Sequence, residues 1–181
     1  MSEFFDVLNE RAEYTGITES RDNCHQKGLW HKAVVVFILN SKSQILLQRR
    51  SAKKKIWPNM WDVSAGGHVL HGEFGFQAAI RETSEELGIS ISPSELCFIG
   101  ATVSSSEVGN IIDNHFNEYY IVNKDIELID ICLQEEEVCD VKWIDVNEII
   151  DKIRNEYHDL TKKNGCWNYL LRYLEIITSG V

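Results

Sequence analysis

The chain has 181 residues, of which 44% are hydrophobic and 25% are charged, a size and composition that predict one globular domain rather than two. Its 28 acidic residues outnumber its 18 basic ones and give a formal net charge of −10, which argues against a general affinity for the nucleic-acid backbone. The sequence has no apolar run of the ~20 residues that a membrane helix needs and no signal-peptide pattern at its start, so we expect a cytoplasmic protein without nucleic-acid or membrane partners.

The N-terminal part of the chain predicts strands joined by turns and loops. Residues 4–8 predict a short strand, which the turn-rich segment 9–16 leads into a hairpin, and residues 22–29 are expected to form a loop. The β-branched and almost wholly apolar residues 33–39 indicate a strand that is buried on both faces. Residues 44–49 predict the strand that returns beside it.

The middle of the chain predicts two short strands and one helix. The strands are expected at residues 61–63 and 67–70, with a break at residues 65–67, where two glycines follow an alanine. Apolar side chains spaced by three and four residues predict a helix over 74–87, and Gly88 is a typical helix stop.

The remaining segments predict further strands and two helices. The strands are expected at residues 97–103, 118–122 and 138–144. The polar residues 104–117 are expected to be a loop between the first two of these strands. Helices are expected at residues 147–157, with Asn147 as N-cap, and at residues 166–177.

Strands with interspersed helices predict an α+β or α/β/α layered fold. No repeat or linker divides the chain, so we expect one domain over residues 1–181, with an N-terminal β segment at 1–30 and the C-terminal helices within 147–177. The five cysteines form no CxxC pair. We therefore expect reduced and mostly buried thiols.

Three glutamates share one face of the predicted helix 74–87. Glu82, Glu85 and Glu86 are spaced so that their carboxylates converge. Like charges at this spacing cost ~0.2–0.5 kcal/mol per pair, whereas a hard divalent cation, Mg²⁺ or Mn²⁺, would turn the repulsion into coordination. Glu73 is a candidate further ligand, and Arg81 is a candidate to orient one of the glutamates. For three glutamates alone, a solvated acidic face remains the alternative.

The sequence around these glutamates resembles the Nudix box, G-x5-E-x7-R-E-U-x-E-E-x-G-U, in which U is a bulky aliphatic residue. The matching positions are Gly67, Glu73, Arg81, Glu82, Glu85, Glu86, Gly88 and Ile89. Thr83 departs from the pattern at a packing position. Because the matches are many and correctly spaced, the resemblance identifies the chain as a member of the Nudix superfamily.

This resemblance implies an α/β/α sandwich around a central mixed β-sheet, in which the box forms a loop–helix–loop metal site. It implies that Glu82, Glu85, Glu86 and the carbonyl of Gly67 bind Mg²⁺, with Glu73 in support. The catalytic groups would be Glu85, Glu86 and Arg81. The base toward the attacking water would be a glutamate of the box or a later carboxylate. The candidates for that later carboxylate are Glu118 and Glu137.

A narrower resemblance is to isopentenyl-diphosphate isomerases and the hydrolases grouped with them. The residues that carry it are His25, His31, the segment 46–50, Lys53–Lys55, Trp57-Pro58, Trp61-Asp62 and the Gly67-His68 pair. The isomerases need a cysteine just before that Gly-His pair and a glutamate on a later strand.

Here Gly66 occupies the position of the cysteine, and Asn114 or His115 the position of the later glutamate. His25, His31 and His68 resemble positions that hold a metal in the isomerases, and both metal or phosphate contact and simple packing stay open for them. The intact box favours hydrolysis over isomerisation.

The only basic cluster of the chain follows the strand at 44–49. Its residues Arg49, Arg50 and Lys53, together with His68, are candidates to bind substrate phosphate. We therefore predict a Mg²⁺-dependent pyrophosphohydrolase that cleaves a small nucleotide-type or isoprenoid-type diphosphate. Isomerisation of a prenyl diphosphate and a non-enzymatic diphosphate sensor are the alternatives. Members of the superfamily are often dimers, so a homodimer is a further expectation.

Overall fold

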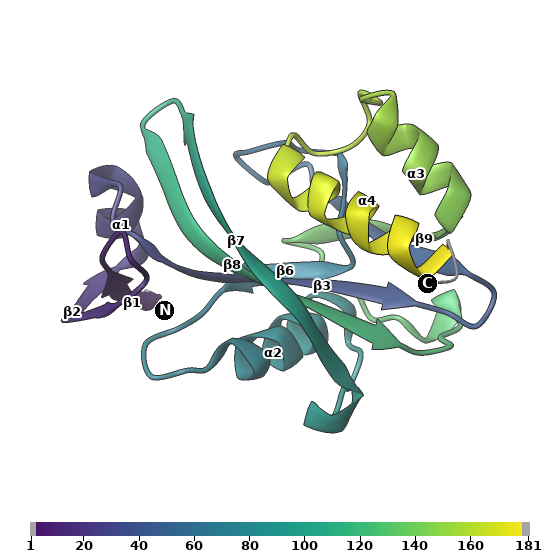
Figure 1. Ribbon diagram of the computed structural model, residues 1–181, viewed down its shortest axis with the longest axis horizontal. Coiled ribbons are helices and arrows are strands. Elements are labelled where there is room, and N and C mark those ends of the chain that lie inside the picture. Colours follow the sequence, from purple (N-terminus) through teal and green to yellow (C-terminus); the bar gives the residue numbers. More distant parts are fainter. Residues whose placement is uncertain (1–2, 179–181) are drawn as a thin grey trace.

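A mixed β-sheet with helices on both faces forms the centre of the computed structural model, which describes residues 3–178 (Figure 1). The strands of this sheet are β3 (His31–Leu39), β4 (Gln44–Arg50), β5 (Trp61–Asp62), β6 (Ala65–His68), β7 (Leu96–Val108), β8 (Ile111–Asn123) and β9 (Val138–Asp145). Their order is β5-β4-β3-β8-β7, with β6 also paired to β3 and β9 to β4. Only β3 and β8 run parallel among these pairs. The expected α+β fold with a mixed central sheet is confirmed.

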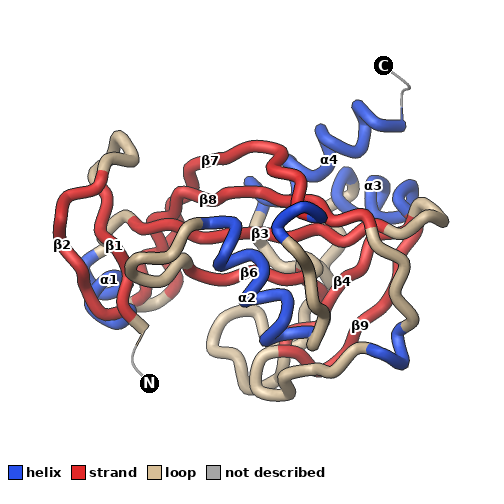
Figure 2. Tube along the Cα trace, turned by 90° about the horizontal axis from the view of Figure 1, so that it is seen from below, coloured by secondary structure: helices blue, strands red, loops and turns tan. Residues whose placement is uncertain are grey.

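Strand β3 is the centre of the core, as its apolar sequence predicts. Its side chains alternate between two separate hydrophobic clusters. Phe37 packs in one cluster with α3 (Val146–Arg154) and α4 (Asn164–Thr178). Val36 packs in the other with α2 (Gly75–Leu87). Figure 2 shows α2 against one face of the sheet and α3 and α4 beyond the other.

The N-terminal segment forms a small unit of its own at one end of the sheet. Strands β1 (Phe4–Leu8) and β2 (Tyr14–Ser20) form the predicted hairpin, a separate two-stranded antiparallel sheet. The helix α1 (Arg21–Lys27) follows, so the expectation of a loop over 22–29 is wrong. Local capping explains the helix: the Ser20 hydroxyl accepts from the amide of Asn23, and Gly28 ends the helix in the left-handed conformation at φ 63°.

A long β-hairpin replaces the loop expected over residues 104–117. Strands β7 and β8 pair without interruption from Ser104↔His115 to Val108↔Ile111, close to the turn at Gly109. The polar sequence concealed these strands because their side chains remain partly or largely exposed. The hairpin therefore extends beyond the covered part of the sheet, toward α1 (Figure 1).

The glycine-rich segment of residues 65–67 also differs from expectation, because it belongs to β6 instead of interrupting a strand. Gly66 faces Val35 of β3, and a Cβ at Gly66 would lie 2.7 Å from the carbonyl oxygen of Val34. Glycine thus allows β6 to approach β3 closely.

The C-terminal helices α3 and α4 lie where the sequence predicts them. The N-cap of α3 is Asp145 rather than Asn147: the carboxylate of Asp145 accepts from the amide of Asn147 at 2.8 Å. Two short 3₁₀ helices, η1 (Pro93–Glu95) and η2 (Leu128–Asp130), complete the described elements. Within residues 3–178, no helix is both long enough and apolar enough to span a membrane.

All five cysteines are free thiols, as expected. Cys24 and Cys166 are buried, whereas Cys97, Cys132 and Cys139 are exposed. The expectation of mostly buried thiols is therefore wrong, because three of the five lie on strands or loops at the surface.

Candidate metal-dependent active site

Helix α2 carries the predicted carboxylates in a fixed orientation. It ends at Gly88, whose φ of 68° is left-handed and whose amide donates to the carbonyl of Ser84. Thr83, which departs from the box, is fully buried and donates its hydroxyl to the carbonyl of Ala79 at 2.8 Å. The departure is accommodated inside the helix, away from the glutamate face.

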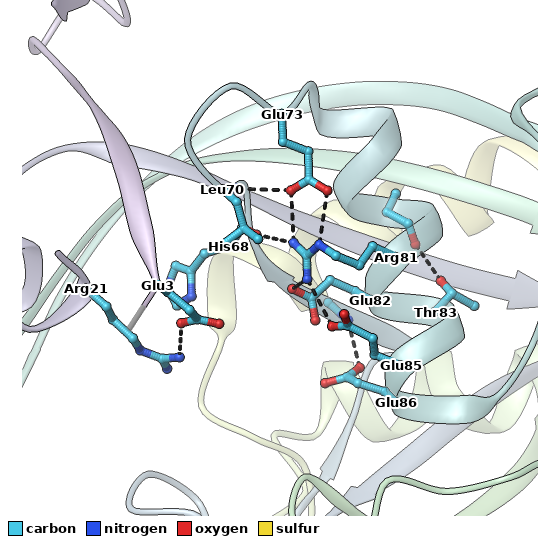
Figure 3. A network of polar contacts seen from close by, with 12 residues as sticks. Glu3, Arg21, His68, Leu70, Glu73, Arg81, Glu82, Thr83, Glu85 and Glu86 are labelled. Atoms are coloured by element: carbon cyan, nitrogen blue, oxygen red, sulfur yellow. Dashed lines mark hydrogen bonds and ion pairs between the residues drawn. The ribbon is translucent and has the colours of Figure 1, made fainter. Parts of the chain in front are cut away.

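Arg81 is the centre of a polar network that joins the box residues (Figure 3). Its Nη1 donates to Glu82 at 2.7 Å and to Glu85 at 3.1 Å, so these two carboxylates do converge. Its Nε and Nη2 each donate to Glu73 at 3.0 Å, in a bidentate pair. Its Nη2 also donates to the main-chain carbonyl of His68 at 2.9 Å. Arg81 thereby fixes three glutamates relative to the end of β6.

Glu86 is the most buried carboxylate of the cluster, with 7% of its surface exposed. Its Oε2 accepts from the amide of Gly66 at 3.1 Å and from Nε2 of Gln48 at 3.0 Å. Burial raises the pKa of Glu86 to about 8, and the neighbouring charge of Glu82 adds to the rise. Sequence reasoning did not identify Gln48, because its contact with Glu86 joins β4 to α2 across the fold.

Gly67 lies directly against the carboxylate of Glu82. A Cβ at Gly67 would lie 2.2 Å from Oε1 of Glu82, so only glycine fits this position as the structure stands. Burial also raises the pKa of Glu82, against the opposing effect of Arg81. Oxygen ligands crowded together, with two carboxyl pKa values raised, fit a hard divalent cation, which would favour the ionised form of both.

The residues predicted to bind phosphate do not share one role in the structure. Nε of Arg49 donates to the carbonyl of Asn59 at 3.0 Å. Arg50 points inward and pairs with the fully buried Asp62 at 3.2 Å. Lys53 is largely exposed and lies 3.7 Å from Glu136. Arg50 is therefore held within the fold, while Lys53 extends into solvent.

The two candidate late carboxylates lie near opposite ends of α2. The carboxylate of Glu118 lies directly against Gly75 at the start of the helix and forms an ion pair with Lys32 at 3.1 Å. That position is about 16 Å along the helix axis from Glu86. Glu137 lies three residues after Gln134, whose amide donates to the main-chain carbonyl of Glu86. Glu137 itself forms an ion pair with Lys54. Glu137 is thus the candidate on the side of Glu86.

Comparison with known protein families agrees with this geometry. The model of the NUDIX domain matches residues 29–163, which include the central sheet, α2 and the network around Arg81. The chain belongs to the Nudix family. As a Nudix hydrolase it acts on pyrophosphate bonds, and such hydrolases generally use divalent metal ions. Membership in this family of hydrolases argues against the alternative of a non-enzymatic diphosphate sensor.

Individual Nudix relatives are similar over most of the chain. An uncharacterized Nudix hydrolase of Listeria monocytogenes is 39% identical over 147 residues, which cover 81% of this chain and 82% of that protein. The isopentenyl-diphosphate Delta-isomerase of Escherichia coli is more distant, at 30% identity over 80% of this chain and 78% of that enzyme. A crystal structure of a Deinococcus radiodurans protein superposes with a TM-score of 0.68 at 23% identity, over 96% of this chain and 98% of that one.

His68, predicted to bind substrate, is placed differently from the other residues of the Nudix loop. Its ring lies with those of His25, His31 and His115, at centroid distances of about 5 Å. Burial lowers the pKa of His31 to about 4 and that of His68 well below its usual value, so these rings are uncharged at neutral pH. The sequence related His25, His31 and His68 to one another only through the isomerases and gave no role to His115.

Proposed function

We propose that this Nudix hydrolase performs Mg²⁺-dependent cleavage of a diphosphate linkage in a small phosphorylated metabolite, releasing two phosphorylated products. The observation that carries the proposal is the convergence of Glu82 and Glu85 on Nη1 of Arg81, beside the buried Glu86 and the close-packed Gly67. Mn²⁺ has the same ligand preferences and is expected to substitute for Mg²⁺.

Each box residue has a defined task in this proposal. Glu82, Glu85, Glu86 and the carbonyl of Gly67 would hold the cation, which neutralises diphosphate charge and lowers the pKa of a bound water. Arg81 keeps Glu82 and Glu85 together and, through Glu73, ties the helix to the preceding loop.

The remaining roles concern the base and the substrate. Glu85 is half exposed and faces the solvent from which the attacking water comes, whereas Glu86 is held by Gly66 and Gln48. One of these two glutamates takes the proton of that water. Among the basic residues, the exposed Lys53 suits contact with substrate phosphate better than the inward-pointing Arg50.

Isomerisation of a prenyl diphosphate is the alternative that the Escherichia coli relative raises. It would require a reactive side chain at position 66, and the backbone around Gly66 leaves no space for one: a Cβ would lie 2.7 Å from the carbonyl oxygen of Val34. Both atoms belong to paired strands, so a side chain there would force β6 away from β3. This packing supports hydrolysis.

The experiment that tests the proposal compares the wild-type protein with Glu85→Gln and Glu86→Gln. A panel of nucleoside triphosphates, dinucleotides, nucleotide sugars and prenyl diphosphates is incubated with Mg²⁺ or Mn²⁺ and followed by phosphorus NMR and product mass. We expect cleavage by the wild type and a loss of at least ~100-fold in kcat for each variant, because each removes one charged ligand.

The controls for this experiment separate loss of chemistry from loss of fold. Circular dichroism and thermal unfolding of both variants without metal should match the wild type, since glutamine keeps the shape of glutamate and one hydrogen-bond-accepting oxygen. Full activity in both variants would refute the site. Conversion of isopentenyl to dimethylallyl diphosphate without phosphate release would refute hydrolysis.

A further inference from the structure

Lys163 is a basic residue that the C-terminal part of the chain brings beside the glutamate site. It directly precedes α4, and its Nζ donates to Oδ2 of the fully buried Asp62 at 2.7 Å. The segment before it is held in place, because the amide of Thr161 donates to the carbonyl of Trp61 and Nε1 of Trp167 donates to the carbonyl of Thr161, both at 2.9 Å. The side chain of Lys163 nevertheless remains 34% exposed. A ligand that arrives from solvent can therefore reach it.

The contacts of Asp62 connect Lys163 with Glu86. Asp62 of β5 lies directly opposite Gln48 of β4 in an antiparallel pair, which places the two side chains on the same face about 5 Å apart. Gln48 in turn donates to Oε2 of Glu86 at 3.0 Å. Burial raises the pKa of Glu86, and the positive charge of Lys163 opposes this rise. The ammonium of Lys163 is thus close enough to Glu86 to act on its charge.

The group formed by Arg50, Asp62 and Lys163 carries an excess of positive charge. The two cations share the single carboxylate of Asp62, which is ionised because their charges hold its pKa below the ordinary value against the effect of burial. Glutamates instead pair with Lys53 and Lys54 in the basic loop. A protein of net charge −10 needs a local positive field to attract a phosphorylated substrate, and this group supplies one beside Glu86.

Support of the buried Asp62 alone does not account for Lys163. Oδ1 of Asp62 accepts from the hydroxyl of Thr161 at 3.0 Å and from the amide of Val63 at 2.9 Å. Its Oδ2 accepts from Nη1 of Arg50 at 3.2 Å. Each oxygen of Asp62 thus has a partner without Lys163, and the charge of Asp62 is already balanced by Arg50.

We propose that Lys163 binds the diphosphate group of the substrate beside Glu86. The inference rests on the proposed function, because it adds a substrate-binding residue to the same site. An ammonium group is a compact point charge that binds phosphate oxygens. Asp62 is its one hydrogen-bond acceptor among the described residues, so two of its three hydrogens remain for the substrate. The segment that leads into α4 would thereby take part in substrate binding.

The test measures binding of methylenediphosphonate, a diphosphate analogue whose bridging CH₂ group prevents hydrolysis. The full chain is titrated with it in the presence of Mg²⁺, by isothermal titration calorimetry. Lys163→Met keeps the apolar stem and removes the charge, so it should weaken binding about tenfold or more. Lys163→Arg should restore most of the affinity. Lys162→Met is the matched control, because it alters the exposed neighbouring lysine, and it should bind as the wild type does.

Thr161→Val separates substrate binding from support of the fold. It removes a hydrogen bond to Asp62 and leaves the charge of Lys163 in place. It should therefore lower Tm but retain wild-type binding of methylenediphosphonate well below the unfolding temperature. Equal weakening of binding in Thr161→Val and Lys163→Met would overturn the proposal. Lys163→Gln, which keeps a hydrogen-bond donor for Asp62, provides the same comparison if Lys163→Met does not fold.

Kinetics distinguish this inference from the proposal of hydrolysis. With a substrate that the wild type cleaves, Lys163→Met should raise KM about tenfold and change kcat less. Cleavage by the wild type with unchanged KM and analogue binding in Lys163→Met would overturn the inference and leave hydrolysis intact. Analogue binding that depends on Lys163, without cleavage of any substrate, would refute hydrolysis and still support Lys163 as a diphosphate ligand. A wild type that does not bind the analogue would overturn the inference as well.

Discussion

At the residue scale, the candidate site depends on main-chain positions as much as on carboxylates. Gly66 donates its amide to Glu86, Gly67 makes room for Glu82, and His68 accepts from Arg81. Three consecutive residues of β6 thus each contact one charged residue of α2. Substitutions in β6 should therefore alter metal binding without changing any ligand side chain.

Gly67→Ala tests this dependence. The added Cβ would lie 2.2 Å from Oε1 of Glu82, so the carboxylate must swing away while Arg81 retains Glu73. We expect the Mg²⁺ concentration for half-maximal activity to rise about tenfold, measured by Mg²⁺ titration of initial rates. Gly165→Ala is the matched control, because its Cβ would meet no described atom within 4 Å. An unchanged Mg²⁺ requirement in Gly67→Ala would contradict the predicted close approach.

Asp62, like Gln48, has a role that the sequence did not reveal. It is fully buried and accepts from Lys163 at 2.7 Å, from Arg50 at 3.2 Å and from Thr161 at 3.0 Å. Burial alone would raise the pKa of Asp62, but the charges of Lys163 and Arg50 outweigh burial and hold that pKa below its ordinary value. Its ionised form therefore stabilises the fold.

Asp62→Asn should lower the free energy of unfolding by about 2–4 kcal/mol at neutral pH, less than for a fully buried pair because Lys163 is partly exposed. A carboxyl group whose pKa is lower in the folded state than in the unfolded state contributes its full stabilisation of the fold above the unfolded-state pKa. It loses this contribution as the pH falls through the folded-state pKa. The difference from wild type should thus stay constant between pH 7 and 5 and shrink below about pH 4. Urea unfolding across this range measures it, and equal stabilities at pH 7 would disprove the role of Asp62.

At the element scale, the sequence predicted the elements whose signals are local. The apolar run of β3, the helical spacing in α2 and the amphipathic α4 each identify themselves without reference to the rest of the fold. The helix α1 and the outer half of the β7–β8 hairpin were missed because their residues are polar. The two also contact each other, because the side-chain amide of Asn114 donates to the carbonyl of Gly28 at 2.7 Å.

Gly28→Ala probes the junction of α1 with β8. Gly28 is left-handed at φ 63°, and a Cβ there would lie 2.9 Å from Cγ2 of Ile112. We expect a loss of about 2 kcal/mol in urea unfolding, of which about 1 kcal/mol is backbone strain. Gly109→Ala has nearly the same φ, 62°, and no described atom within 4 Å, so it should lose only the strain part. Equal losses in the two variants would show that α1 does not pack on β8 in solution.

At the scale of the whole molecule, the central sheet separates the glutamate site on α2 from the part of the core that α3 and α4 cover. The glutamates lie on α2, on one face of the sheet, and α3 and α4 cover the other face. The sequence predicted the glutamate site because its ligands share one helix. It could not predict that His25, His31, His68 and His115 lie together, since these residues meet only when α1, β3, β6 and β8 come together.

The separation of the two faces predicts that stability and activity can be altered independently. Leu170 on α4 and Leu87 on α2 are both fully buried, in different clusters. Each leucine-to-alanine substitution should cost about 2–5 kcal/mol in urea unfolding. Leu87 adjoins Glu86, and its carbonyl accepts from the amide of Cys132 at the end of the helix, so its loss should also shift the glutamates.

Mg²⁺ titrations of initial rates, at a temperature well below both unfolding transitions, distinguish the two leucines. Leu170→Ala should retain the wild-type Mg²⁺ requirement and kcat per folded molecule. Leu87→Ala should need several-fold more Mg²⁺, because the cavity lets the last turn of α2 move against the sheet. Equal changes in Mg²⁺ requirement would mean that strain passes through the sheet, and the glutamate site would then depend on both layers rather than on the α2 layer alone.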